Sequence, residues 1–220
     1  MLCRTERKPL LPDADNAAEG KSNRFSSIPE VLTIMSILGI IALVFGVAGV
    51  LLTIKQSIWC WPAALISVVT SGYEFYESRL FGDMALQVFY FVSGVYGWIY
   101  WAKGKDGAEP PIVAMGWSRA AIVLAATAAA AGGLGWLAGQ VTDAQASTFD
   151  AMLTGLSVVA QILLSRKVLE NWLFWIITDI LSIGVYASQG LYPTAALYVV
   201  LLVLATWGLW EWQRARRVAG

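Results

Sequence analysis

Apolar runs separated by short polar breaks recur along this chain from residue 31 to residue 212. A helix rises about 1.5 Å per residue and a bilayer core is about 30 Å thick, so a run of about 20 apolar residues predicts one transmembrane helix. The breaks contain charged, glycine or proline residues, as in the segment 103–111. Seven transmembrane helices are predicted, at about 31–54, 58–78, 82–102, 118–138, 149–166, 170–188 and 191–212.

The apolar pattern repeats at an offset of 111 residues. The segment LFGDMALQVFYFVSGVYGWIYW (80–101) matches LYPTAALYVVLLVLATWGLWEW (191–212), and the register extends upstream to Trp61/Trp172 and Ser71/Ser182. Each copy contains three predicted helices, and the helix at 118–138 links them. An odd number of helices in each copy, plus one linker, gives both copies the same orientation. The predicted fold is therefore an all-α membrane protein of two parallel three-helix repeats (3+1+3), an arrangement found in transporters.

These helices divide the chain into five predicted parts. Residues 1–27 form a polar tail whose composition predicts disorder. The first repeat covers 28–103, the loops and linker helix 104–147, and the second repeat 148–213, and a basic C-terminal tail follows at 214–220.

Composition narrows the function. The chain is 58% apolar, with 11 Trp and 8 Tyr, which is typical of a multi-span membrane protein with aromatic belts or cavities. The zero net charge gives no indication of a nucleic-acid partner, and the absence of His removes His triads and His–metal sites. Two Cys, one of them in the polar tail, make no disulfide framework or zinc site. No Walker-type phosphate loop is present, and we expect no cofactor.

Positively charged loops predict the orientation in the membrane. Outside the N-terminal tail, nine Lys and Arg residues fall on the side of the C-terminus, including Lys55 and Lys167 in equivalent loops of the two repeats, whereas the other side has only Arg79. We therefore expect a cytoplasmic C-terminus and an external N-terminus. The basic residues of the N-terminal tail favour the reverse orientation.

Asp179 lies in the middle of the sixth predicted helix, where an ionisable group is costly and usually functional. At 100° per residue, one face of this helix carries Trp172, Trp175, Asp179, Ser182 and Tyr186. This face predicts a ligand site, although Asp179 could instead bond to a neighbouring helix.

The third predicted helix has a similar stripe with Gln87, Tyr90 and Phe91. Asn171 is a further candidate at the start of the sixth helix, where capping is the alternative role. Trp61, the equivalent of Trp172, and Tyr198, the equivalent of Gln87, complete the predicted substrate-binding residues.

The two copies differ at their polar positions, since Asp179 corresponds to Val68 and Trp175 to Ala64. This divergence predicts one asymmetric site shared by both halves. Aromatic faces attract cations, a carboxylate supplies the counter-charge, and an amide reads hydroxyl or amide groups. We therefore expect a flat ligand with polar substituents, preferably a cation.

Several segments at these positions are similar to the PnuC family of nicotinamide riboside transporters. They are WPAALISVV (61–69), RLFGDMALQVFYF (79–91), VYGWIYW (95–101), SRKVLENWLFWIITDILSIGVYASQGLY (165–192) and the terminal WGLWEWQR. The resemblance covers about 28–214 and implies a SWEET-like fold. It also implies uptake of nicotinamide riboside, a precursor of NAD, by facilitated diffusion across a bacterial inner membrane. A cytoplasmic kinase would trap the substrate by phosphorylation, and the resemblance implies homo-oligomers, with a trimer as the expected form.

Other functions are weighed against this one. Thiamine, another vitamin carried within the family, is also a flat cation, so the predicted cavity fits it equally. A retinal-type sensor needs a Schiff-base lysine in the last helix, and 191–212 contains none. An intramembrane enzyme would need a catalytic base or metal set that the sequence does not offer, so we expect no enzymatic activity.

Overall fold

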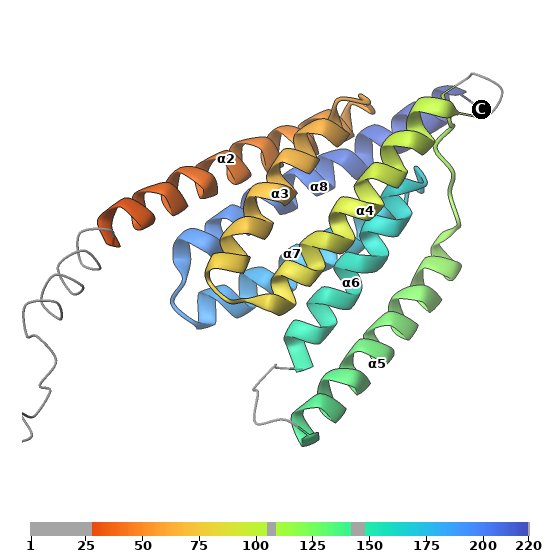
Figure 1. Cartoon of the computed structure of the whole chain (residues 1–220). Coiled ribbons are helices and arrows are strands. Elements are labelled where there is room, and N and C mark those ends of the chain that lie inside the picture. Colours follow the sequence, from red (N-terminus) through yellow and green to blue (C-terminus); the bar gives the residue numbers. More distant parts are fainter. Residues whose placement is uncertain (1–27, 105–108, 142–147, 220) are drawn as a thin grey trace, which may run out of the picture. The chain divides into compact units, whose positions relative to one another are not determined.

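The computed structural model describes residues 28–104, 109–141 and 148–219. These residues form seven helices, which confirms the predicted all-α architecture; beyond the helices they include one isolated bridge between Val113 and Val168. The helices are α2 (Ile28–Ile54), α3 (Cys60–Glu77), α4 (Phe81–Lys103), α5 (Trp117–Val141), α6 (Thr148–Ser165), α7 (Asn171–Ser188) and α8 (Tyr192–Ala219). Figure 1 shows them in chain order.

Five of the helices in the described residues are long and apolar enough to cross a membrane, namely α2, α5, α6, α7 and α8. The other two, α3 and α4, have 18 and 23 residues and contain more polar groups. Their sequences include Glu74, Glu77 and Gln87. All seven begin and end within about three residues of the predicted positions, except at the end of α8.

The last helix extends beyond its predicted end. The sequence predicted a separate basic tail at 214–220, whereas α8 continues through Arg214, Arg216 and Arg217 to Ala219. Arg and Ala have high helix propensity, and positive charge in a last turn interacts favourably with the helix dipole. The end of the apolar pattern therefore does not mark the end of the helix.

The chain divides into two compact units, Met1–Leu38 and Gly39–Gly220. The described residues of the first unit are the beginning of α2. In the second unit α3 packs against α4, α5 against α6, and α7 against α8, while α6 also contacts α4 and α7. The Ser67 hydroxyl of α3 donates a hydrogen bond of 2.7 Å to the Ala42 carbonyl of α2.

The loops of the two halves repeat each other at the offset of 111 residues. Gln56 and Lys167 both adopt the left-handed conformation, with φ of 56° and 55°. Arg79 and Gly190 do so at the next pair of equivalent turns, with φ of 59° and 75°. Equivalent hydrogen bonds of 2.9 Å join the amides of Gln56 and Lys167 to the carbonyls three residues before them. The backbone thus preserves the repeat where the side chains have diverged.

Four tryptophans form the core between the two halves. Trp61 and Trp101 of the first half meet edge to face at 5.4 Å, and Trp172 and Trp212 of the second half do the same at 5.5 Å. Trp101 and Trp212 then contact each other across the halves at 6.0 Å. We call these four residues the tryptophan quartet.

Candidate functional site

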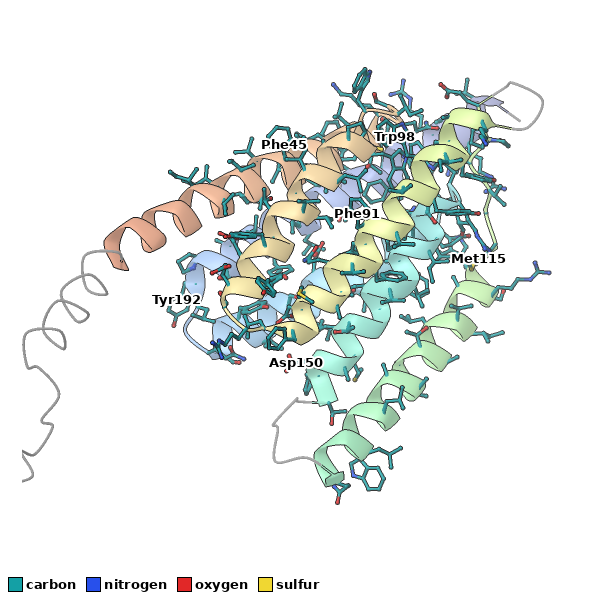
Figure 2. The ribbon with its side chains drawn as sticks, in the orientation of Figure 1. Phe45, Phe91, Trp98, Met115, Asp150 and Tyr192 are labelled. Atoms are coloured by element: carbon teal, nitrogen blue, oxygen red, sulfur yellow. The ribbon has the colours of Figure 1, made fainter. Side chains whose placement is uncertain are left out.

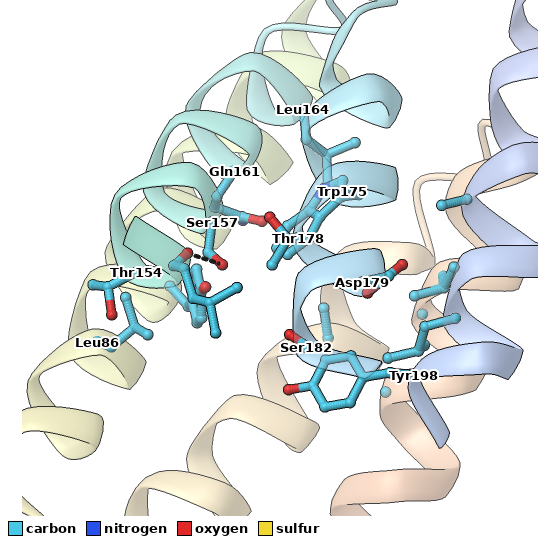
Figure 3. A pocket seen from close by; sticks show the side chains of 18 of the residues that line it. Leu86, Thr154, Ser157, Gln161, Leu164, Trp175, Thr178, Asp179, Ser182 and Tyr198 are labelled. Atoms are coloured by element: carbon cyan, nitrogen blue, oxygen red, sulfur yellow. Dashed lines mark hydrogen bonds between the residues drawn. The ribbon is translucent and has the colours of Figure 1, made fainter. Parts of the chain in front are cut away.

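A cavity of about 510 Å³ lies within the second unit, among the six helices of the two repeats (Figure 3). Its lining residues belong to α2, α3, α4, α6, α7 and α8, and none of them belongs to the linker helix α5. A cavity of this volume is typical of small-molecule sites. Both repeats therefore contribute to the described cavity wall, and the linker helix does not.

Equivalent positions of the two halves face the cavity together. In seven pairs related by the offset of 111 residues, both members line it. They are Gly46/Ser157, Val50/Gln161, Thr53/Leu164, Ala64/Trp175, Phe75/Tyr186, Gln87/Tyr198 and Tyr90/Leu201. Because most pairs join unlike residues, the backbone frame is symmetric while the chemistry of the wall is asymmetric.

Asp179 is the only carboxylate that lies deep within the described part of the cavity wall. It is in the middle of α7, its residue surface is 4% exposed, and it lines the cavity near Ser182 and Tyr198 (Figure 3). Neither Lys nor Arg occurs among the described lining residues. Uncompensated negative charge in an apolar surrounding favours a cationic ligand.

Aromatic side chains cover both ends of the α7 face. Trp172 and Tyr186 both line the cavity and are separated by 14 residues, which corresponds to about 21 Å along a helix. Tyr186 stacks on Tyr198 of α8 with ring centroids 5.3 Å apart and an interplanar angle of 13°. Trp175 lies between these ends, one helical turn from Asp179. Flat apolar walls near a carboxylate suit a flat cationic ring.

Eight of the eleven predicted substrate-binding residues line this cavity. They are Gln87, Tyr90, Trp172, Trp175, Asp179, Ser182, Tyr186 and Tyr198. Helical spacing places the five α7 residues on one face, and Gln87 and Tyr198 occupy equivalent positions of the two halves.

The other three predicted residues lie elsewhere. Asn171 is fully buried, and its amide donates a hydrogen bond of 2.7 Å to the Val168 carbonyl, so it shapes the α6–α7 loop. Trp61 is buried in the tryptophan quartet. Phe91 is 42% exposed on the outer surface of α4 (Figure 2). The predicted stripe on α4 included Phe91. Because Phe91 is adjacent to Tyr90, its side chain is turned by about 100° from that of Tyr90 around the helix axis.

Sequence reasoning missed a polar stripe on α6. Thr154, Ser157 and Gln161 all line the cavity and lie on one face of the helix at spacings of three and four residues (Figure 3). The Ser157 hydroxyl donates a hydrogen bond of 2.8 Å to the Leu153 carbonyl and lies beside the Tyr90 hydroxyl. The sequence did contain a signal for this stripe, because Gln161 is a glutamine inside an apolar run. The same kind of signal indicated Gln87.

Two charged residues in the α6–α7 loop, Glu170 and Lys167, lie outside the cavity lining, and Glu170 binds the start of the linker helix. The buried Glu170 carboxylate accepts hydrogen bonds from the backbone amides of Met115 (3.0 Å) and Gly116 (2.9 Å), directly before α5. The backbone of Val113 also pairs with this loop, at Lys167 and Leu169. The loop before α7 is thus hydrogen-bonded to the segment before the linker helix α5.

Lys167 is buried in the same loop, with 2% of its surface exposed. Its Nζ lies 4.7 Å from the centroid of the Trp101 ring and 3.8 Å from the Glu109 carboxylate. Burial lowers the pKa of the Lys167 ammonium from its ordinary value, and the charge of Glu109 partly opposes this shift. The cation–π contact and the ion pair together offset part of the cost of burying the charge.

Comparisons with known proteins agree with this architecture. The nicotinamide riboside transporter PnuC of Escherichia coli is 29% identical over 182 residues, covering 71% of this chain and 76% of the relative. The riboflavin/roseoflavin transporter RibM of Streptomyces davaonensis is 26% identical over 187 residues, covering 83% and 84%. The crystal structure of the vitamin B3 transporter PnuC matches with a TM-score of 0.69 at 24% identity, covering 90% of this chain and 88% of that one.

The structural match supports the fold, and the sequence matches are to membrane transporters and not to enzymes. Residues 36–214, which include all the cavity-lining positions, match the family described as nicotinamide mononucleotide transporters. The chain therefore belongs to the nicotinamide mononucleotide transporter family, the PnuC transporters of the membrane.

Proposed function

We propose that this chain carries nicotinamide riboside across the membrane. The observation that carries the proposal is the buried Asp179 carboxylate in an aromatic cavity whose described lining contains no Lys or Arg. Nicotinamide riboside has a flat pyridinium ring with a positive charge, a carboxamide and a ribose. The ring suits the faces of Trp172 and Trp175, the charge suits Asp179, and the polar groups suit Gln87, Tyr90 and Ser182.

The same charge argument separates candidate ligands within the family. Nicotinamide mononucleotide carries a negatively charged phosphate, which Asp179 would repel. The described lining residues include no Lys or Arg that could bind this phosphate. Riboflavin, named for one relative, has a neutral ring system that gains nothing from Asp179. Thiamine is a flat cation and is the second candidate, because Asp179 favours it for the same reason.

Transport follows an alternating-access route in this proposal. The cavity lies between two equivalent halves, and rocking of one half against the other would open it to each side in turn. We infer facilitated diffusion into the cytoplasm, where a riboside kinase would trap the substrate by phosphorylation. The basic residues on the C-terminal side support a cytoplasmic C-terminus in the bacterial inner membrane. We further propose a homo-oligomer, with a trimer as the expected form, as the working assembly.

Uptake into liposomes tests the proposal. The full chain is reconstituted, labelled nicotinamide riboside is added outside, and unlabelled compounds compete. We expect saturable uptake down the gradient, inhibited by unlabelled nicotinamide riboside and not by nicotinamide mononucleotide or riboflavin. Stronger inhibition by thiamine than by nicotinamide riboside would make thiamine the substrate. Uptake no greater than in protein-free liposomes, from correctly folded protein, would contradict the proposal.

A further inference from the structure

The strongest unassigned feature of the cavity is the side-chain amide of Gln161. This residue lies in α6, its surface is 9% exposed, and it lines the cavity. In the described part of the chain, no hydrogen bond reaches its amide, and its polar atoms are not among those sealed inside the protein. They therefore open onto the cavity. An amide in an apolar helix is costly unless something bonds to it.

The other half of the protein shows that the wall does not require an amide at this place. Val50 of α2 is the equivalent of Gln161 at the offset of 111 residues and lines the same cavity. A branched apolar side chain is thus compatible with the helix packing at the equivalent position. The amide of Gln161 is an addition to the wall that packing alone does not explain.

The position of Gln161 relative to Asp179 indicates which part of a ligand it would contact. Figure 3 shows Gln161 on the α6 side of Trp175 and Asp179 on the α8 side. A flat ring against Trp175 would then present one edge to the carboxylate and the other to the amide. An amide side chain offers both donors and an acceptor, as a carboxamide does, so two such groups can bond reciprocally.

We propose that Gln161 is a specificity-determining residue that hydrogen-bonds the neutral carboxamide of the substrate ring, while the Asp179 carboxylate pairs with the positive charge of that ring. The inference rests on the proposed function and adds a second point of recognition to it. Sites built to bond a polar group reject analogues that lack the group, because the amide of the protein then stays buried and unpaired. The carboxamide should therefore contribute to affinity only when Gln161 is present.

Paired ligands and variants test this role. Binding of nicotinamide riboside and of the pyridinium riboside that lacks the carboxamide is measured on the purified full chain by calorimetric titration. Wild-type protein is expected to prefer the carboxamide compound by about tenfold or more. Gln161→Met keeps the length and helix propensity of the side chain but cannot bond, so the preference should fall to about one.

Two further variants keep the result interpretable. Gln161→Val copies the residue of the other half and is used if the Met variant is unstable. Ile162→Met changes the adjacent, outward-facing residue of α6 and should leave the preference unchanged. An equal loss of affinity for both ligands, or an unchanged preference, would overturn the role of Gln161 while leaving the proposed function standing. If wild-type protein binds neither ligand, the proposed function fails and the inference fails with it.

Discussion

At the scale of single residues, the proposed function depends most on Asp179. Placing a carboxylate at the centre of a membrane helix costs about 2.5–3.5 kcal/mol on insertion scales. The equivalent position of the first half is Val68, so the fold itself does not need the charge. No ion pair involving Asp179 occurs among the described residues. We propose that a cationic ligand supplies the partner and so offsets this cost.

Replacing Asp179 with Asn removes the charge and keeps the size of the side chain. We expect the affinity for nicotinamide riboside to fall by at least about tenfold, because one partner of a buried charge pair is lost. Titration of the purified variant gives the affinity, and thermal unfolding checks that it is folded. Unchanged affinity in a folded Asp179→Asn protein would exclude the carboxylate from ligand binding.

Lys167 provides a test that depends on pH. Because burial lowers its pKa, the unfolded chain binds a proton that the folded chain releases, at pH values between the lowered pKa and the ordinary value of 10.5. Stability from this site therefore rises as pH increases through that window.

Comparing wild type with Lys167→Met isolates the contribution of this group. We expect the unfolding midpoint of the wild type to rise relative to the variant as pH approaches 10.5. Lys103→Met, at an exposed position, is the matched control for loss of a lysine. If the unfolding midpoint of the wild type falls relative to that of the variant as pH increases, the pKa of Lys167 is not lowered by burial.

The sequence identified the residues of α7 better than those elsewhere, for a physical reason. A single helical face carries Trp172, Trp175, Asp179, Ser182 and Tyr186, so periodicity alone brings them together. The role of Gln161 depends on how α6 is rotated against α7, which is set by packing between helices. Asn171 lies outside the cavity lining, since its amide nitrogen donates a hydrogen bond to the loop backbone.

At the scale of elements, the tryptophan quartet depends on two glycines. Gly97 packs directly on the ring of Trp61, and the equivalent Gly208 packs on the ring of Trp172. A Cβ atom added at Gly208 would lie 2.6 Å from ring atoms of Trp172, closer than real contacts allow. The matched pair Gly97/Gly208, recognised in the sequence as a repeat, is therefore explained by close approach of helix to indole.

Substituting Gly208 with Ala should destabilise the protein by about 1–3 kcal/mol, because the added methyl forces the quartet apart. Gly184→Ala is the matched control, since nothing lies within 4 Å of a Cβ added there and Ala favours a helix over Gly. Thermal unfolding in detergent measures both variants. Equal midpoints for Gly208→Ala and Gly184→Ala would contradict the tight packing of the quartet.

The helices themselves were largely predictable, because the length of an apolar run directly reflects the thickness of the bilayer. The end of α8 was not, since Arg and Ala at 214–219 continue the helix after the apolar pattern has stopped. The hydrogen bonds between Glu170 and the segment before α5 could not be predicted either, because the backbone amides that donate them are more than 50 residues away in the sequence.

At the scale of the whole molecule, duplication supplies the frame and divergence supplies the site. Equivalent turns, equivalent glycines and equivalent tryptophans hold both halves in the same geometry. Within that frame, seven equivalent pairs line one cavity, and most of their polar members belong to the second half. In the proposed function, an asymmetric ligand binds in this cavity and the two similar halves rock around it.

The proposed function requires that Asp179 recognises the charge of the ligand. Two ligands that differ in charge and share their other groups test this requirement. Nicotinamide riboside has a cationic pyridinium ring, and its reduced dihydropyridine form is neutral but keeps the carboxamide and the ribose. Binding of both to the purified full chain is measured by titration. We expect the cation to bind at least about tenfold more tightly, and equal or stronger binding of the neutral form would show that Asp179 does not recognise the charge.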